Sequence, residues 1–177
     1  MRVLGAILAG GQASRFGSNK ALALYRGRPL IAHVAQALGG QVDTVAICGG
    51  EPVLPGACHL TDRPLAGLGP LGGLAAALFY ASNNGFDSVA SVGCDTPLLP
   101  GNLINLLGAT GFASYLENMP LIGWWPTGLT DALDAFLTRD SRRSMRGWAE
   151  AAGARPVNFV GQIANINTPD DLGALPC

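Results

Sequence analysis

Short apolar runs alternate with segments of helical periodicity along the first half of the chain. Val3–Leu8 is a continuous apolar run that ends before two glycines, which is typical of a strand buried on both faces of a sheet. Leu30, Val34 and Leu38 then recur at helical spacing and predict an amphipathic helix. The same criteria predict further strands at 42–48, 59–61, 88–93, 111–116, 121–125 and 156–160, and further helices near 71–79, 102–107, 129–137, 144–152 and after Thr168.

This alternation predicts the class of fold. Strands and helices that follow one another in turn are joined by right-handed crossovers, which place the strands parallel and the helices on either side. We therefore expect an α/β protein with a doubly wound, mostly parallel sheet and helices on both faces, as in Rossmann-like folds. The pattern loosens after Pro100, which divides one compact domain of residues 1–177 into halves of about 1–100 and 101–177.

Charge is scarce and balanced, and this limits the partners. Eleven basic and twelve acidic residues leave no broad positive field for nucleic acid or for an anionic membrane. Residues 64–86 carry no charge over 23 positions, but five glycines and Pro70 argue against a membrane span. The first residues resemble a short secretion signal, but Gly5 interrupts the apolar run, so we interpret it as a buried strand.

The four cysteines do not form a metal or redox motif. Cys48, Cys58, Cys94 and Cys177 contain no CxxC pair, which argues against zinc and thioredoxin-like sites. Reduced thiols in the cytoplasm are the preferred interpretation.

The segment 8–20 carries the clearest chemical signal. It leaves the carboxyl end of a buried strand, where open α/β sheets bind ligands. Gly10 and Gly11 let backbone N–H groups approach an anion, while Arg15 and Lys20 add positive charge. These features indicate a triphosphate-binding loop, although its lysine does not stand in a Walker motif. A glycine turn with two solvated cations is the alternative.

Two isolated carboxylates follow strands. Asp95 comes directly after the strand at 88–94 and is expected at the carboxyl edge of the sheet, facing the Gly10 loop. A single Asp there suits Mg²⁺, whose shell is completed by water and substrate phosphates. Asp62 begins an Asp-Arg-Pro turn after the strand at 59–61. Plain turn-forming roles remain the alternative for both residues.

Two polar clusters lie in the second half. Asn165 and Asn167 flank Ile166, and alternation in an extended segment places both amides on one side. A group of four arginines is suited to bind a second phosphate, or else forms a solvated helix face: Arg139, Arg142, Arg143 and Arg146.

Taken together, these motifs resemble the MobA-like molybdenum cofactor guanylyltransferases, a family of nucleotidyltransferases. The resemblance rests on LAGGxxxRxGxxK at 8–20, the GxPL element at 27–30, and the motifs at 69–74, 94–97 and 165–172.

The resemblance implies transfer of GMP from GTP to the terminal phosphate of molybdopterin or its molybdenum-loaded form, with release of pyrophosphate and a requirement for Mg²⁺. It assigns nucleotide binding to the first half and acceptor binding to the second, and leaves room for a protein that delivers the acceptor. The implied nucleotide contacts are Leu8, Ala9, Gly10, Gly11, Lys20 and Asp62, with Arg15 and Lys20 neutralising charge, Asp95 binding the metal, and Asn165, Asn167, Arg142 and Arg143 facing the acceptor.

Two positions depart from the family pattern. Cys48-Gly49-Gly50 stands where the family often has an asparagine, and Met119-Pro120-Leu121 replaces His-Pro-Thr. Two alternatives remain: a cytidylyl- or sugar-phosphate nucleotidyltransferase of the same fold, and a nucleotide-binding protein without transferase activity. Retention of both Lys20 and Asp95 argues against the second.

Overall fold

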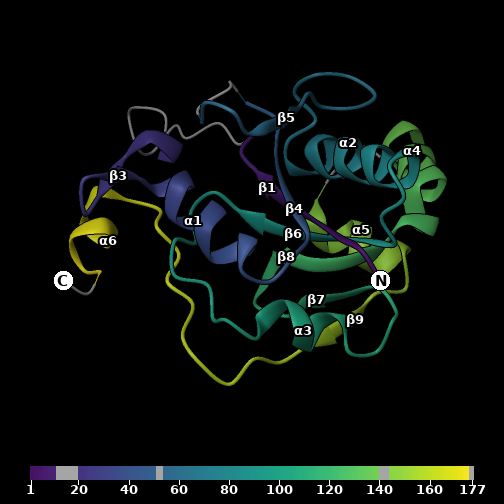
Figure 1. Cartoon of the computed structure of the whole chain (residues 1–177). Coiled ribbons are helices and arrows are strands. Elements are labelled where there is room, and N and C mark those ends of the chain that lie inside the picture. Colours follow the sequence, from purple (N-terminus) through teal and green to yellow (C-terminus); the bar gives the residue numbers. More distant parts are fainter. Residues whose placement is uncertain (11–19, 51–53, 140–143, 176–177) are drawn as a thin grey trace.

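The computed structural model describes residues 1–10, 20–50, 54–139 and 144–175. Within them one seven-stranded sheet forms the centre of the molecule (Figure 1). From edge to edge its strands are β5 (Cys58–Leu60), β4 (Thr44–Cys48), β1 (Val3–Leu8), β6 (Ser88–Gly93), β8 (Met119–Pro126), β7 (Ser114–Leu116) and β9 (Arg155–Val157).

The directions of the strands confirm a mostly parallel, doubly wound sheet. Strands β5, β4, β1 and β6 run parallel, with β1 at the centre of the winding. β8 runs antiparallel to both of its neighbours, whereas β9 is parallel to β7. The carboxyl ends of β1, β4 and β6 therefore meet at one edge, as the expected site requires.

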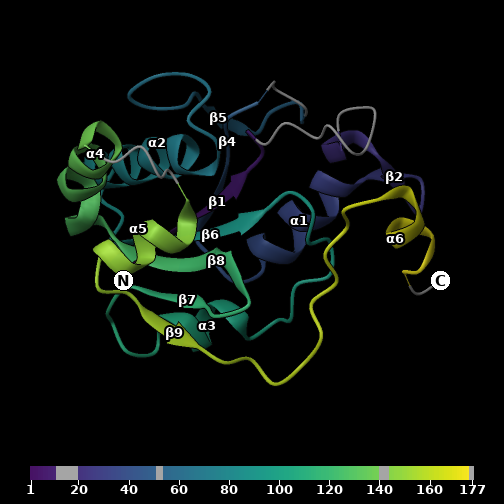
Figure 2. The same ribbon diagram turned by 180° about the vertical axis from the view of Figure 1, so that it is seen from behind.

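Helices cover both faces of the sheet. α1 (Leu30–Gly39) and α3 (Leu103–Gly108) share one apolar cluster, and α2 (Pro70–Asn83), α4 (Thr130–Arg139) and α5 (Met145–Ala151) share another. Figures 1 and 2 show α2 and α4 on the side of the sheet opposite α3. All of β1 is buried because Leu4, Ala6 and Leu8 face α2 while Val3 and Ile7 face α1.

A smaller apolar cluster joins residues 23–30 to the C-terminal segment. Tyr25, from the hairpin of β2 (Leu24–Tyr25) and β3 (Arg28–Pro29), packs with Leu30 and with Ile166 of the C-terminal segment. That segment runs from β9 to α6 (Pro169–Gly173), which lies beside the hairpin (Figure 2). Thr168 and Asp171 form the capping box that the sequence predicts for this helix.

Several expected boundaries differ from the structure. The strand expected at 111–116 begins at Ser114, and the one expected at 156–160 ends at Val157, because each pairs with its neighbours over three residues only. The β2–β3 hairpin is not predicted, since strands of two residues carry no periodicity. Short 3₁₀ turns also occur at Lys20–Leu22 and Thr127–Leu129. None of the helices in the described residues has both the length and the apolar character that a membrane crossing needs.

Candidate active site

Three side chains that are distant in sequence meet at the carboxyl edge of the sheet. Lys20 Nζ donates to Asp95 Oδ2 at 3.1 Å and to Asn167 Oδ1 at 3.2 Å. The side chains of Lys20 and Asp95 are 13% and 17% exposed, so the ion pair is largely shielded from water. An ammonium group has three donors, and these two contacts leave one for a ligand.

Asp95 is held firmly at the end of β6. Its carbonyl oxygen accepts the N–H of Ile166 at 2.9 Å, and the Thr96 hydroxyl donates to Gly93 O at 2.9 Å. The carboxylate folds back so that its Oδ1 occupies the space that a Cβ on Gly93 would need. Glycine at position 93 therefore allows this orientation of the acid.

The donor set at Asp95 fits one type of metal. No group of three or more His, Cys, Asp or Glu side chains gathers anywhere in the described part of the chain. A cation at Asp95 would thus have few protein ligands of these types among the described residues, which suits Mg²⁺ because this ion usually keeps several waters and is completed by phosphates.

The two asparagines lie near Asp95 and Lys20. Ile166 is 1% exposed in the small cluster, Asn165 lines a cavity together with Asp95, and Asn167 contacts Lys20. Asp171 Oδ2 accepts the N–H groups of Asn167 and Thr168, both at 2.8 Å. These hydrogen bonds lower the pKa of Asp171 and fix the backbone that carries Asn167.

Asp62 lies against a cradle of glycines. A Cβ on Gly49 would lie 2.6 Å from Asp62 Oδ1, one on Gly72 would lie 3.0 Å from Asp62 Cγ, and one on Gly10 would lie 3.7 Å from both carboxylate oxygens. Asp62 Oδ1 is buried and has no hydrogen-bond partner among the described residues. Burial raises the pKa of Asp62, and a hydrogen bond from the Gly67 backbone only partly offsets this. A buried acceptor without a donor is suited to a ligand that brings N–H groups.

The Cys48-Gly49-Gly50 departure has a structural reason. Gly49 has φ of 73° and Gly50 of 67°, a region that side chains rarely adopt. Gly49 N–H donates to Leu60 O at 2.9 Å, and Ala9 N–H donates to Cys48 O at 2.9 Å. Because Gly49 has no side chain, it leaves space for the Asp62 carboxylate. Glycine at positions 49 and 50 also permits the positive φ of both residues.

Arg63 supports the turn that carries Asp62, a role that the sequence analysis does not include. Its guanidinium lies 3.6 Å from the centre of the Phe79 ring, and Nη2 is 3.5 Å from Asp134 Oδ2. Its backbone N–H donates to Gly72 O at 3.1 Å. Arg63 thereby joins the turn to both α2 and α4.

The cysteines of the described residues are free thiols. Cys94 adjoins Asp95, and burial raises its pKa to about 11. Burial also raises the pKa of Cys48 well above its usual range. Both thiols are therefore protonated near neutrality, and neither is suited to act as a nucleophile.

A cavity of about 320 Å³ opens beside Asp95. Its wall includes Asn165 from the C-terminal segment, Met119 from β8 and Arg146 from α5. Four of the residues expected in the site, Gly11, Arg15, Arg142 and Arg143, lie outside the described residues. Leu8, Ala9 and Gly10 lie where expected, at the end of β1.

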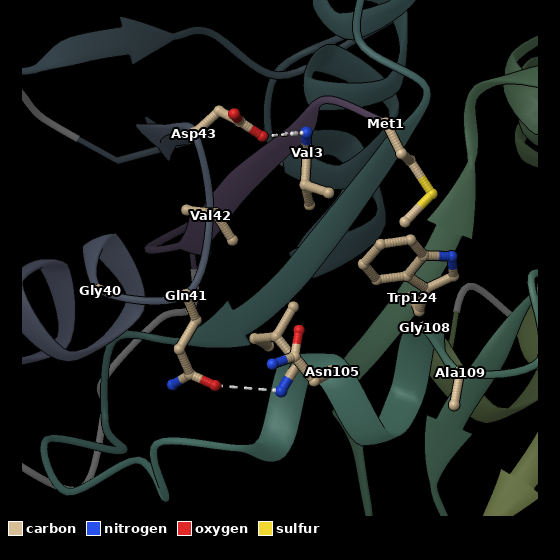
Figure 3. Close-up of a pocket in the computed structure, with 11 residues that line it drawn as sticks. Met1, Val3, Gly40, Gln41, Val42, Asp43, Asn105, Gly108, Ala109 and Trp124 are labelled. Atoms are coloured by element: carbon tan, nitrogen blue, oxygen red, sulfur yellow. Dashed lines mark hydrogen bonds between the residues drawn. The ribbon is translucent and has the colours of Figure 1, made fainter.

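A larger cavity of about 510 Å³ lies at the opposite end of the sheet, near Met1 and Trp124 (Figure 3). It contains none of the expected site residues. Its polar side chains already serve the fold, because Asp43 accepts the N–H of Val3 at 2.7 Å and Gln41 accepts that of Ile104 at 3.1 Å. Size alone does not make it the better candidate site.

The fold is an α/β fold that solved nucleotidyltransferases share. Among solved structures, molybdopterin-guanine dinucleotide biosynthesis protein A from Archaeoglobus fulgidus aligns with a TM-score of 0.73 at 20% identity, over 98% of this chain and 95% of that one. The 2-C-methyl-D-erythritol 4-phosphate cytidylyltransferase of Thermus thermophilus aligns with a TM-score of 0.68 at 15% identity, over 98% and 95%. A Mycobacterium tuberculosis protein solved in complex with manganese gives a TM-score of 0.62 at 14% identity, over 99% and 100%.

The chain belongs to the MobA-like NTP transferase family, whose domain model matches residues 5–156. The molybdenum cofactor guanylyltransferase of Rhodobacter capsulatus is 39% identical, over 97% of this chain and 94% of its own length. That of Acidiphilium cryptum is 35% identical, over 95% and 91%. These relatives confirm the family that the sequence motifs indicate.

Proposed function

We propose that this protein transfers GMP from GTP to the phosphate of molybdopterin or its molybdenum-loaded form, producing the guanine dinucleotide cofactor and pyrophosphate. The observation that carries the proposal is the contact of Lys20 with both Asp95 and Asn167, at the strand edge between the Gly10 backbone and the cavity. The names of the relatives support the same reaction.

The nucleotide would lie across the ends of β1 and β4. The backbone at Ala9 and Gly10 would contact it, and we assign Gly11 and Arg15 to its phosphates as well. Lys20 would bind phosphate oxygens through its remaining donor. Asp62 offers a buried acceptor to the N1–H and N2–H groups of guanine, which a cytosine cannot match with the same two donors.

Asp95 would hold Mg²⁺ through its carboxylate. When bound, the ion would neutralise charge on the triphosphate. Lys20 already neutralises this carboxylate in the structure, so it would exchange part of its contact with Asp95 for the phosphates. A fold neighbour was solved in complex with manganese, which is also a divalent ion.

The acceptor would approach from the cavity beside Asp95 and Asn165. An oxygen of its phosphate attacks the α-phosphorus of GTP, the new P–O bond forms as the bond to the β-phosphate breaks, and pyrophosphate leaves. The protein contributes by aligning the two phosphates and offsetting charge, with no covalent intermediate. We assign Arg142 and Arg143 to the acceptor side, and nucleotide and acceptor binding to about 1–100 and 101–177 of a single domain.

Two measurements test this function. Pyrophosphate release from GTP, measured with Mg²⁺ and molybdopterin, is expected to be lost in Asp95→Ala and kept in Asp131→Ala, which changes an exposed acid on α4. Near-normal release by Asp95→Ala would refute the metal assignment. With Mg²⁺ present, GTP should raise the Tm more than CTP, ATP or UTP does. A preference for CTP would favour the cytidylyl alternative, and nucleotide binding without turnover would favour the non-catalytic one.

The cysteines suggest where this reaction takes place. We place it in the cytoplasm, because the cysteines of the described residues are free thiols and a reducing compartment keeps thiols in that state.

A further inference from the structure

One cation of the described residues faces the cavity beside Asp95, and the proposed function has not used it. The wall combines apolar side chains such as Met119, Leu121 and Met145 with a few polar ones. Asp95 and Asn165 provide the polar groups on the side of the sheet edge, whereas Arg146 provides a positive charge from α5. A cavity of this kind suits a ligand with a largely uncharged body and one anionic group.

Arg146 is fixed in place before any ligand arrives. Its Nη2 donates to the carbonyl oxygen of Glu117 at 2.7 Å, which joins α5 to the turn between β7 and β8. Its base is equally fixed, because Met145 beside it is buried and Ser144 Oγ accepts the N–H of Gly147 at 3.0 Å at the start of the helix. An arginine side chain ordered in advance loses less conformational entropy when it binds an anion.

The remaining donors of Arg146 have the geometry that a phosphate needs. A guanidinium carries five N–H groups in a planar fork, and the contact with Glu117 uses one of them. Phosphate oxygens accept two parallel hydrogen bonds from such a fork. At the other end of the cavity, Asp95 is already paired with Lys20, so its negative charge does not compete strongly for Arg146.

We propose that Arg146 binds the phosphate of the acceptor and makes the enzyme selective for a phosphorylated acceptor. This inference rests on the proposed function. Arg146 would hold non-attacking oxygens of the phosphate monoester while another oxygen points toward the α-phosphorus beside Asp95. The monoester attacks as its dianion, so the step needs no proton transfer, and Arg146 acts only by binding and orientation.

The test compares the purified full chain with its variants Arg146→Gln and Arg146→Lys. Arg155→Gln serves as the control, because it removes a cation of the same half that packs on Phe112 and does not line the cavity. Arg146→Gln is expected to raise the KM for molybdopterin by about tenfold or more, as a lost charge-assisted contact predicts. The KM for GTP should stay within about twofold, and Arg146→Lys should be intermediate because it keeps the charge without the fork.

A second probe distinguishes phosphate binding from support of the cavity wall. The dephosphorylated pterin, used as a competitive inhibitor, should bind wild type and Arg146→Gln equally well. If Arg146→Gln weakened the binding of the phosphorylated and dephosphorylated ligands equally, the inference would be overturned, since Arg146 would then support the cavity wall or contact the pterin. An unchanged KM for molybdopterin would overturn it as well. A wild-type protein that forms no dinucleotide from GTP and molybdopterin would instead refute the proposed function, and with it this role.

Discussion

The close approach of Asp62 to Gly49 leads to a prediction with a matched control. Gly49→Ala places a methyl group where the Asp62 carboxylate now lies, with Asp62 Oδ1 at 2.6 Å and Gly10 Cα at 3.1 Å. Gly56→Ala introduces a methyl group at nearly the same backbone conformation, φ of 77° against 73°, but with no atom within 4 Å. The two variants therefore share backbone strain and differ in their effect on Asp62.

The contacts in the structure indicate how large the changes in stability and in GTP affinity should be. An alanine in the left-handed region costs about 1–2 kcal/mol, which is the loss of stability expected of Gly56→Ala, and Gly49→Ala should lose at least as much because its Cβ also crowds Asp62 and Gly10. In Gly49→Ala the carboxylate must also move, and Gly72 blocks it on another side, since a Cβ there would lie 3.0 Å from Asp62 Cγ. If Asp62 binds guanine, the loss of a hydrogen bond to a charged group costs about 1.5–3 kcal/mol more on binding. This corresponds to a Kd for GTP raised roughly 10- to 100-fold.

The assay pairs two measurements on each variant. Thermal unfolding without nucleotide reports the shared strain, and calorimetric titration with GTP and Mg²⁺ reports the contact with Asp62. We expect both variants to lower the Tm and only Gly49→Ala to weaken GTP binding. If Gly49→Ala binds GTP within about twofold of Gly56→Ala, Asp62 does not contact the base and the reasoning fails.

Three further predictions follow from charge. Without metal, Asp95→Asn should bind GTP severalfold more tightly than wild type, because the substitution frees Lys20 from its ion pair and removes a carboxylate that repels phosphate. Equal affinities of the variant and wild type for GTP, measured by calorimetry with EDTA, would contradict this prediction. Burial raises the pKa of Asp62, so its charged form destabilises the fold as pH rises; Asp62→Asn should raise the Tm near about pH 8 and not near about pH 3. The pKa of Asp171 is lowered, so its ionised carboxylate stabilises the fold above the usual Asp pKa, and this stabilisation is lost on acidification. Asp171→Ala should therefore lower the Tm at about pH 7, and a difference in Tm that persists at about pH 2 would show that the charge of Asp171 is not the cause.

The order of apolar positions predicts most of the sheet, but not every strand direction. β1 is an uninterrupted apolar run and β6 is apolar apart from the small residues Ser88 and Ser91, so their burial at the centre follows from the sequence. Apolar periodicity does not predict the antiparallel course of β8, because periodicity is the same for either direction. Only two residues separate β7 from β8, and such a short connection requires an antiparallel pair; this signal was available in the sequence.

The candidate site also contains residues that the sequence predicts and residues that it does not. Residues that directly follow a strand, such as Gly10 and Asp95, are placed by the rule that ligands bind at the carboxyl ends of parallel strands. Gly49 and Arg63 act through contacts with Asp62, α2 and α4, and such contacts appear only once the chain is folded. Arg146 shows both cases, because its place in the helix expected at 144–152 follows from the sequence whereas its approach to Glu117 does not.

The burial of Ile166 has a consequence for protein synthesis. This residue and its neighbours Asn165 and Asn167 are translated after every strand of the described sheet, yet Ile166 N–H bonds Asp95 O and Asn167 bonds Lys20. A nascent chain can therefore complete the sheet while Lys20 and Asp95 still lack these contacts. The segment before α6 emerges after the strands of the described sheet, so the hydrogen bonds from Ile166 N–H to Asp95 O and between Asn167 and Lys20 are added to a sheet that can already have formed.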